Sequence, residues 1–370
     1  MPVKAPVVQD TKEIGPVTVT IGTGIAMLTL PDVGSMVTRG PNQSAARFPV
    51  VQTYNLADDL NDKVGWAVNG SIAVPVGLAT VSLNGFWAQI KGKSSSSCTP
   101  VEPASAGDLC VVVPLFDKPS ATPPVNGVLG PSNGSFGGQL AINSERTVNQ
   151  WGAALESKWA INRDFIGLSS PLFRPYWAVG VDVRGIYQKL DATISTTATN
   201  SPAFSFVDTY GENLNTTYSG AYLAWGADFS PILPLFRSWG LENAFRLQGG
   251  IYYAHTSYSG QLANTGSIIG GGGDPTSALT LSRNDAAFIG GVTLETRKKI
   301  SSRATLSLKS EYEYYSFVPQ MTYNTAVQNN NNPFNGAGRQ FGTFIGSNDA
   351  FSMRTSLRLT IALGPDELYK

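Results

Sequence analysis

The chain has 370 residues, of which only 14% are charged, and its 26 Lys and Arg balance its 26 Asp and Glu. Soluble domains carry about 25% charged residues, and a neutral chain has no overall field that attracts nucleic acid. Polar residues also interrupt every apolar run well before the roughly 20 consecutive apolar residues that a transmembrane helix needs. The composition therefore argues against a nucleic-acid-binding protein and excludes a helical membrane protein.

A period of two runs through the chain from residue 16 to residue 363. Apolar and polar residues alternate there, which places successive side chains on opposite faces of a β-strand. Residues 1–15 precede this region and are predicted to form a periplasmic extension, and residues 364–370 form a tail. We expect strands at 16–29, 64–74, 78–91, 148–161, 171–190, 216–230, 241–257, 285–297, 303–317 and 349–363.

The last two segments show the alternation most clearly. Between Met353 and Leu363 one phase is apolar, whereas the other contains Arg354 and Arg358. Between 303 and 317, leucines and tyrosines alternate with Lys309 and other polar residues. A helix has 3.6 residues per turn and would mix these two sets. The pattern predicts a sheet with one apolar face and one charged face.

Segment and connection lengths together predict a closed barrel. Each segment reaches the roughly 9 to 11 residues that a tilted strand needs to cross a bilayer, and bacterial barrels have an even number of strands. Connections are long after odd segments and short after even ones, which in outer-membrane barrels places long loops outside and both termini in the periplasm. The predicted fold is an all-β, closed antiparallel up-and-down transmembrane β-barrel of about 10 strands, with 12 as the alternative count and short periplasmic turns. Its expected extracellular loops are 30–63, 92–147, 191–215, 258–284 and 318–348.

A soluble β-sandwich or propeller is the alternative, because its strands also alternate between apolar and polar residues. Two features favour the membrane barrel. The segments are longer than the five or six residues of an average soluble strand. Trp and Tyr also gather near segment ends, as in the aromatic girdles of membrane barrels: Trp87, Trp151, Trp159, Trp177, Trp239, Tyr253 and Tyr314.

The opening PVKAP, followed by Gly-rich alternating segments, resembles the mature N-termini of alphaproteobacterial outer-membrane β-barrel, porin-like proteins. The resemblance implies a place in the bacterial outer membrane, surrounded by lipid and lipopolysaccharide. Such proteins usually end on an aromatic residue, whereas this chain continues past Leu363 with GPDELYK, which looks like the C-terminus of green fluorescent protein. Thr209, Tyr210 and Gly211 look like the chromophore tripeptide of that protein, but they are expected in a polar loop, so fluorescence is not predicted.

Cys98 and Cys110 are the only cysteines, and both fall in the predicted loop 92–147. Their spacing suits a small disulfide ring in an oxidising compartment, which would stabilise the loop by on the order of 3 kcal/mol. Two reduced, exposed cysteines are the alternative. We predict the disulfide.

The single histidine, His255, limits the catalytic schemes open to this chain. His255 and Ser257 match the His-x-Ser spacing of the outer-membrane lipid A deacylase family, but no Glu stands in the matching downstream stretch to orient the imidazole. The omptin proteases use an Asp-x-His pair, and here Tyr253 takes the Asp position. An esterase of the lipid A deacylase kind is therefore only a minor alternative, and no enzymatic activity is predicted. Neither a metal site nor a cofactor site is expected.

Charged residues of both signs share the polar phase and are predicted to line the lumen. In one interpretation they form a narrow porin-like channel for ions or small polar solutes. In the other they pair with one another inside a narrow barrel, and the long loops bind a surface protein partner. The permeant solute and the oligomeric state are left open. The predicted lumen-lining residues are Glu156, Lys158, Arg174, Asp182, Arg184, Asp228, Glu242, Arg246, Glu295, Arg297, Lys309, Glu311, Glu313, Arg354 and Arg358.

Overall fold

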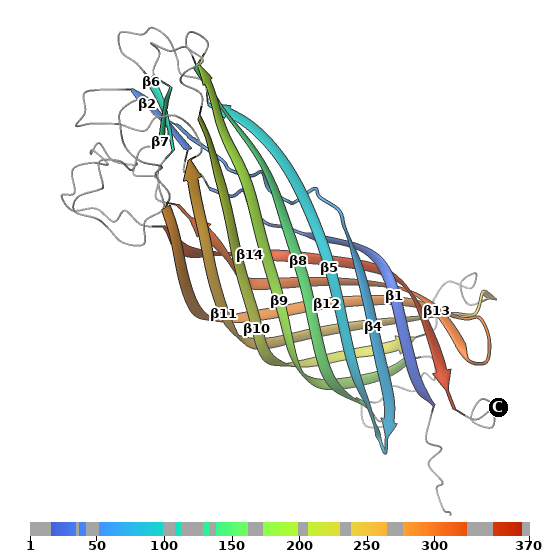
Figure 1. Cartoon of the computed structure of the whole chain (residues 1–370). Coiled ribbons are helices and arrows are strands. Elements are labelled where there is room, and N and C mark those ends of the chain that lie inside the picture. The colour runs from blue at the N-terminus through green and yellow to red at the C-terminus, as the bar shows by residue number, and fades with distance from the viewer. Residues whose placement is uncertain are drawn as a thin grey trace, which may run out of the picture.

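The computed structural model describes residues 16–34, 37–41, 52–98, 108–112, 129–132, 138–161, 173–198, 206–229, 238–264, 277–323 and 343–364. Ten antiparallel strands close into a barrel (Figure 1). No helix in these residues is long and apolar enough to cross a membrane. The barrel strands are β1 (Val17–Leu28), β4 (Gly65–Val76), β5 (Ala79–Cys98), β8 (Gly138–Ala160), β9 (Phe173–Ala198), β10 (Phe206–Phe229), β11 (Leu241–Asn264), β12 (Ser277–Lys299), β13 (Ala304–Thr322) and β14 (Phe344–Leu363).

The ring closes between the first and last strands. Val17 pairs with Leu363, and β1 also pairs with β4 on its other side. The two described ends of the chain therefore lie side by side, at the end of the barrel that also holds the turns at 77–78 and 300–303. We call this end the turn end and the opposite one the loop end. Gly77 has a φ of 62°, which suits the two-residue turn of a hairpin. The predicted fold class and the ten strands are confirmed.

An apolar belt surrounds the outer face of the barrel. Leu223 is 65% exposed and Ile251 is 75% exposed, whereas the adjoining Tyr222 and Tyr252 point inward and are buried. A soluble protein of this size rarely exposes so continuous an apolar surface. A barrel that faces hydrocarbon needs this arrangement, because apolar side chains then face outward and polar ones inward.

Two aromatic rows bound the belt. Trp159 and Trp177 stack with ring centroids 4.5 Å apart in a turn-end girdle, and Trp151 and Tyr187 lie 6.3 Å apart in a loop-end girdle. Trp151 and Trp159 are eight residues apart on β8, which is roughly 26 Å of strand. For strands tilted by about 40°, this corresponds to roughly 20 Å along the barrel axis, which is somewhat less than the apolar band of about 25 Å in membrane barrels.

The strands run farther beyond the loop-end girdle than the sequence patterns predicted. β9 has 26 residues and continues to Ala198, and β10 begins at Phe206. Residues 191–198 and 206–215 of the predicted loop 191–215 therefore lie in strands, and these include Thr209 to Gly211. The alternation of long and short connections is also weaker than predicted, because 161–172 at the turn end is longer than 199–205. The alternation of inward and outward residues persists in this part, but polar residues replace apolar ones outside.

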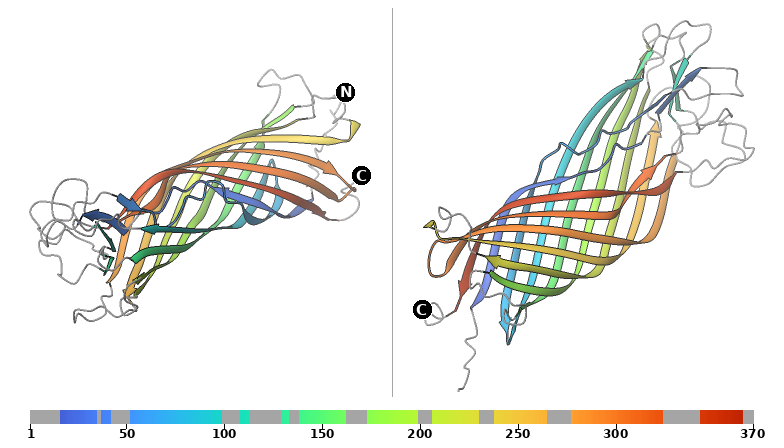
Figure 2. Two further views of the ribbon diagram at one scale, coloured as in Figure 1. Left: turned by 90° about the horizontal axis from the view of Figure 1, so that it is seen from above. Right: turned by 180° about the vertical axis from the view of Figure 1, so that it is seen from behind.

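The part of the barrel beyond the loop-end girdle is taller on one side. β12 pairs with β13 only between Ile289 and Lys299, so its upper residues pair with β11 alone among the described strands. The six strands β5 and β8 to β12 form a tall wall that leans over the rest of the barrel (Figure 2). The shorter wall consists of β13, β14, β1 and β4.

A second sheet lies at the loop end. Its strand order is β3 (Gln52–Tyr54), β2 (Val37–Pro41), β6 (Asp108–Val112) and β7 (Leu129–Ser132). The sequence analysis predicted only loops here, because these strands are too short for their alternation to be recognised. Residues 1–15 and the tail beyond residue 364 lie outside the described residues, so their predicted roles stay predictions.

The predicted disulfide also stays a prediction, because the side chain of Cys110 is outside the described ones. Cys98 ends β5 and is buried, and β6 carries Cys110 to the same end of the molecule. We expect unfolded, unreduced protein to take up no iodoacetamide and fully reduced protein to take up one label on each cysteine. Mass spectrometry measures the labels, and uptake before reduction would rule the bond out.

Candidate functional site

All fifteen predicted lumen residues lie on the inner face, and each forms an ion pair with another member of the set. Eight are cations and seven are anions, so the lumen has nearly balanced charge. Arg174 and Glu242 are each 55% exposed at the turn end, and exposure falls to 7% or less at Arg184 and Glu313. Water therefore reaches the charges from the turn end.

The innermost charges form a central charge layer of Asp182, Arg184, Glu313 and Arg354. The Arg184 guanidinium donates to Asp182 Oδ2 at 2.5 Å and to Glu313 Oε1 at 2.9 Å. Arg354 Nη2 lies 2.9 Å from Glu313 Oε2, and the Tyr315 hydroxyl donates to the same oxygen at 3.2 Å. β9 and β13 are not neighbours in the ring, so these bonds cross the lumen and join its opposite walls.

A second cluster lies closer to the turn end. Arg246 donates to both oxygens of Glu156, at 3.0 and 2.5 Å, and the Tyr222 hydroxyl donates to Glu156 Oε2 at 2.8 Å. Arg297 lies 2.8 Å from Asp228 Oδ1. Glu156 is on β8 and Arg246 on β11, so this cluster also spans the lumen.

A small cavity remains among these side chains. Its volume is about 130 Å³, and Asn69, Asn84 and Phe86 line it together with the charged residues. Such a volume holds only a handful of water molecules. The structure thus supports the interpretation in which the charges pair and fill the lumen.

An apolar layer closes the lumen just beyond the charges. Tyr218 and Tyr315 are almost fully buried and meet edge to face, with ring centroids 5.8 Å apart. The Tyr218 hydroxyl donates to the backbone carbonyl of Phe317 at 2.9 Å. Ile90 and Ile186 complete the layer from β5 and β9. These side chains belong to the barrel wall itself, so the closure is a packed core and not a mobile plug.

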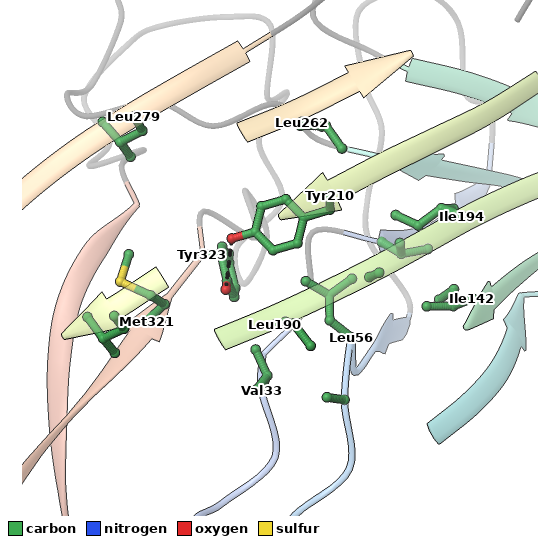
Figure 3. Close-up of a cluster of buried hydrophobic side chains, with 14 of the residues drawn as sticks. Val33, Leu56, Ile142, Leu190, Ile194, Tyr210, Leu262, Leu279, Met321 and Tyr323 are labelled. Atoms are coloured by element: carbon green, nitrogen blue, oxygen red, sulfur yellow. Dashed lines mark hydrogen bonds between the residues drawn. The ribbon is translucent and has the colours of Figure 1, made fainter. Parts of the chain in front are cut away.

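A second apolar cluster lies inside the lumen at the loop end (Figure 3). Ile142, Leu190 and Ile194 of the tall wall pack there with Val33 and Leu56 from the connection between β1 and β4. In the described part of the chain, apolar side chains therefore lie inside the lumen at two levels.

Several buried polar residues at the loop end were not among the predicted lumen residues. The Tyr210 hydroxyl donates to Glu212 at 2.5 Å, and Tyr323 donates to the same carboxylate. Arg146 donates to the Gln188 side chain at 2.8 Å. Glu212 lay in a predicted loop, although it shares the inward phase of its strand. The continued alternation was the signal that could have found it.

The outer face of the tall wall carries a polar hollow of about 710 Å³. Its residues lie on β9 to β12, beyond the loop-end girdle, and form cross-strand rows. One row runs from Lys189 through Asn213 and Ser259 to Thr280, and the next contains Asp191, Gly211 and Gln261. This hollow is not evident from the sequence, because all of its residues except Lys189 lie in segments that were predicted to be loops.

His255 lies on the outer face of β11. Its Nδ1 is 2.7 Å from the Asn284 side-chain oxygen, and Asn284 is an amide rather than the carboxylate of a catalytic triad. Ser257 is exposed on the same face. No group of acidic, histidine or cysteine side chains that could hold a metal occurs among the described residues.

Comparisons with known proteins identify membrane barrels of low similarity. No family model matches the chain, and no curated protein matches it. The outer membrane protease OmpT of Escherichia coli is 10% identical with a TM-score of 0.40, and the match covers 94% of this chain and 97% of that one. The Pseudomonas putida toluene transporter TodX is 7% identical with a TM-score of 0.21, covering 95% and 91%. An anion-selective porin from Comamonas acidovorans is 11% identical with a TM-score of 0.13, covering 93% and 100%. These similarities are too low to transfer an activity.

Proposed function

We propose that this chain is a bacterial outer-membrane barrel whose lumen is closed and whose function lies at its extracellular surface. The apolar layer around Tyr218 and Tyr315 carries this proposal. Burying a side chain of this size contributes about 1.5 to 3 kcal/mol, so displacing the whole layer would cost far more than thermal motion supplies. The apolar belt and the two girdles support the membrane location. The loop end then faces outward, and the turn end faces the periplasm.

The elements at the loop end support a surface role. Long connections and a separate four-stranded sheet gather there, and binding residues commonly lie on loops that a rigid scaffold positions. The partner is a surface molecule of the same cell or of another one. The resemblance to alphaproteobacterial barrels suggests the source but stays a prediction.

The test is the conductance of purified protein in planar bilayers. A closed lumen predicts no conductance steps above those of protein-free bilayers. A known porin in the same bilayers is the positive control. Discrete steps from the wild-type protein would contradict the proposal.

A narrow channel for ions or small polar solutes is the second candidate. The exposed charges at the turn end and the cavity of about 130 Å³ favour this candidate. Together they provide a polar path through the half of the lumen that is nearer the turn end. This candidate requires conductance steps whose size or selectivity changes in Arg354→Gln or Glu311→Gln. Conductance steps whose size and selectivity are the same in both variants as in wild type would come from a contaminant.

We predict that β6 and β7 of the second sheet are dispensable for barrel assembly. Cys98 pairs with Leu140 across β5 and β8, so a short turn can replace residues 101–136 without loss of a barrel strand. The shortened protein should keep the heat-modifiable migration of a folded barrel on gels. Replacement of residues 143–150 inside β8, which removes part of the wall, is the matched control and should abolish it. Loss of folding in both proteins would contradict the prediction.

A further inference from the structure

The polar hollow lies directly above the loop-end girdle. On β9, Tyr187 belongs to the girdle, and the next outward residues are Lys189 and Asp191. They lie about 7 and 13 Å farther along the strand. A bilayer interface at the girdle therefore places the hollow in the layer of the lipid headgroups.

The side chains around the hollow are mainly neutral hydrogen-bonding groups. Asn213 and Gln261 offer amides that both donate and accept, and Ser259 offers a hydroxyl. Lys189 and Asp191 form an exposed ion pair of 2.7 Å. Sugar hydroxyls also both donate and accept, so they match amides and hydroxyls better than a cluster of one charge sign would. The volume is within the roughly 300 to 1,000 Å³ of ligand pockets.

The floor of the hollow is open at Gly211. A Cβ at this position would meet no atom closer than Asp191 Oδ1, at 3.8 Å. The absence of a side chain thus keeps the centre of the hollow empty. It also means that the Cβ of a substituted residue meets no wall atom closer than ordinary van der Waals distance.

We propose that the hollow binds the saccharide headgroup of a glycolipid in the outer leaflet of the membrane. The inference rests on the proposed membrane orientation, and it names the surface ligand that the proposed function leaves open. The acyl chains of the glycolipid would lie against the apolar belt. Its first sugars would reach the rows of Lys189 and Asp191.

The experiment measures binding of three probes to the full-length protein in detergent by native mass spectrometry. The probes are lipopolysaccharide with its core sugars, lipid A without them, and the free core oligosaccharide. Wild type should bind whole lipopolysaccharide about tenfold more tightly than lipid A. Gly211→Trp, which fills the hollow from its floor, should reduce this preference to about one.

Two further variants separate the effect of the hollow from the effect of added bulk. Ser95→Trp places the same bulk on the outer face of β5, outside the hollow, and should keep the preference. The double variant Asn213→Ala and Gln261→Ala removes hydrogen-bonding groups without added bulk and should lose it. Heat-modifiable migration checks that each variant is folded.

Several outcomes would overturn the inference. Equal binding of whole lipopolysaccharide and lipid A by wild type would mean that the belt alone binds lipid. An unchanged preference in Gly211→Trp, or an equal loss in Ser95→Trp, would show that the hollow is not the site. Free oligosaccharide that binds as tightly as the whole glycolipid would overturn the membrane ligand. None of these results depends on conductance, so failure of the closed-lumen proposal is detected separately.

Discussion

Glu313→Gln should destabilise the folded barrel by about 3 to 5 kcal/mol, because removing one member of a buried ion pair leaves its partners uncompensated. Glu313 accepts hydrogen bonds from Arg184, Arg354 and Tyr315. Glutamine keeps the shape of the side chain but not its charge. Arg184 retains Asp182 as an ion-pair partner, whereas Arg354 retains a longer ion pair of 3.7 Å with Glu311 and its contact with the Phe86 ring. Urea unfolding in detergent or lipid, followed by tryptophan fluorescence, measures the change.

Glu242→Gln is the matched control for this prediction. Glu242 also lies on the inner face, but it is 55% exposed and its pair with Arg174 is 3.4 Å long. Exposed ion pairs contribute about 0 to 1 kcal/mol, so this variant should unfold almost as wild type does. Equal destabilisation by the two substitutions would show that burial of the central charge layer has no special effect.

The double variant Tyr218→Ala and Tyr315→Ala should make the lumen conductive. Among the described residues, these two tyrosines are the largest side chains with less than 2% exposure, and they lie directly beyond the central charge layer. Their removal joins the water-accessible lower lumen to the space above it. Each truncation should also cost about 3 to 5 kcal/mol of stability. Planar-bilayer recording should therefore show steps in the variant and none in wild type.

Outward-facing tyrosines provide the control for this experiment. Tyr253 is 55% exposed and Tyr312 is 44% exposed, both on the outer face. Their double replacement by alanine removes the same atoms from the belt and should leave the lumen silent. A silent Tyr218→Ala and Tyr315→Ala protein that is shown to be folded would place the decisive barrier in the upper apolar cluster around Leu190 and Ile142.

The pairing of the lumen charges shows where sequence reasoning stops. The period of two placed Arg184 and Glu313 on the inner face, because each strand fixes the direction of its own side chains. It could not show that these two residues bond, because β9 and β13 meet only across the lumen of a closed ring. The same limit applies to Arg246 and Glu156. For this reason the sequence alone leaves the channel interpretation open.

The extent of the strands was the second property that the sequence obscured. In the strand segments that carry the belt, apolar and polar residues alternate strongly along the sequence. The bilayer-spanning parts of the strands could therefore be predicted. Beyond the loop-end girdle, each face of the sheet carries both apolar and polar residues. Tyr210, Glu212 and Leu214 alternate inward with outward Asn213 and Gly211, and this pattern resembles a polar loop. Cross-strand hydrogen bonding, not hydropathy, continues the sheet there.

The sequence by itself determined the ten strands, their antiparallel order and the sets of residues that face inward and outward, because a strand fixes these properties locally. Only the tertiary structure decided what the inner face does. Ring closure brings cations and anions from opposite walls within bonding distance, and it places Tyr218 against Tyr315 so that the lumen is sealed. It also aligns short polar stretches of four strands into the outer hollow. These features depend on contacts between distant segments, which no single strand pattern contains.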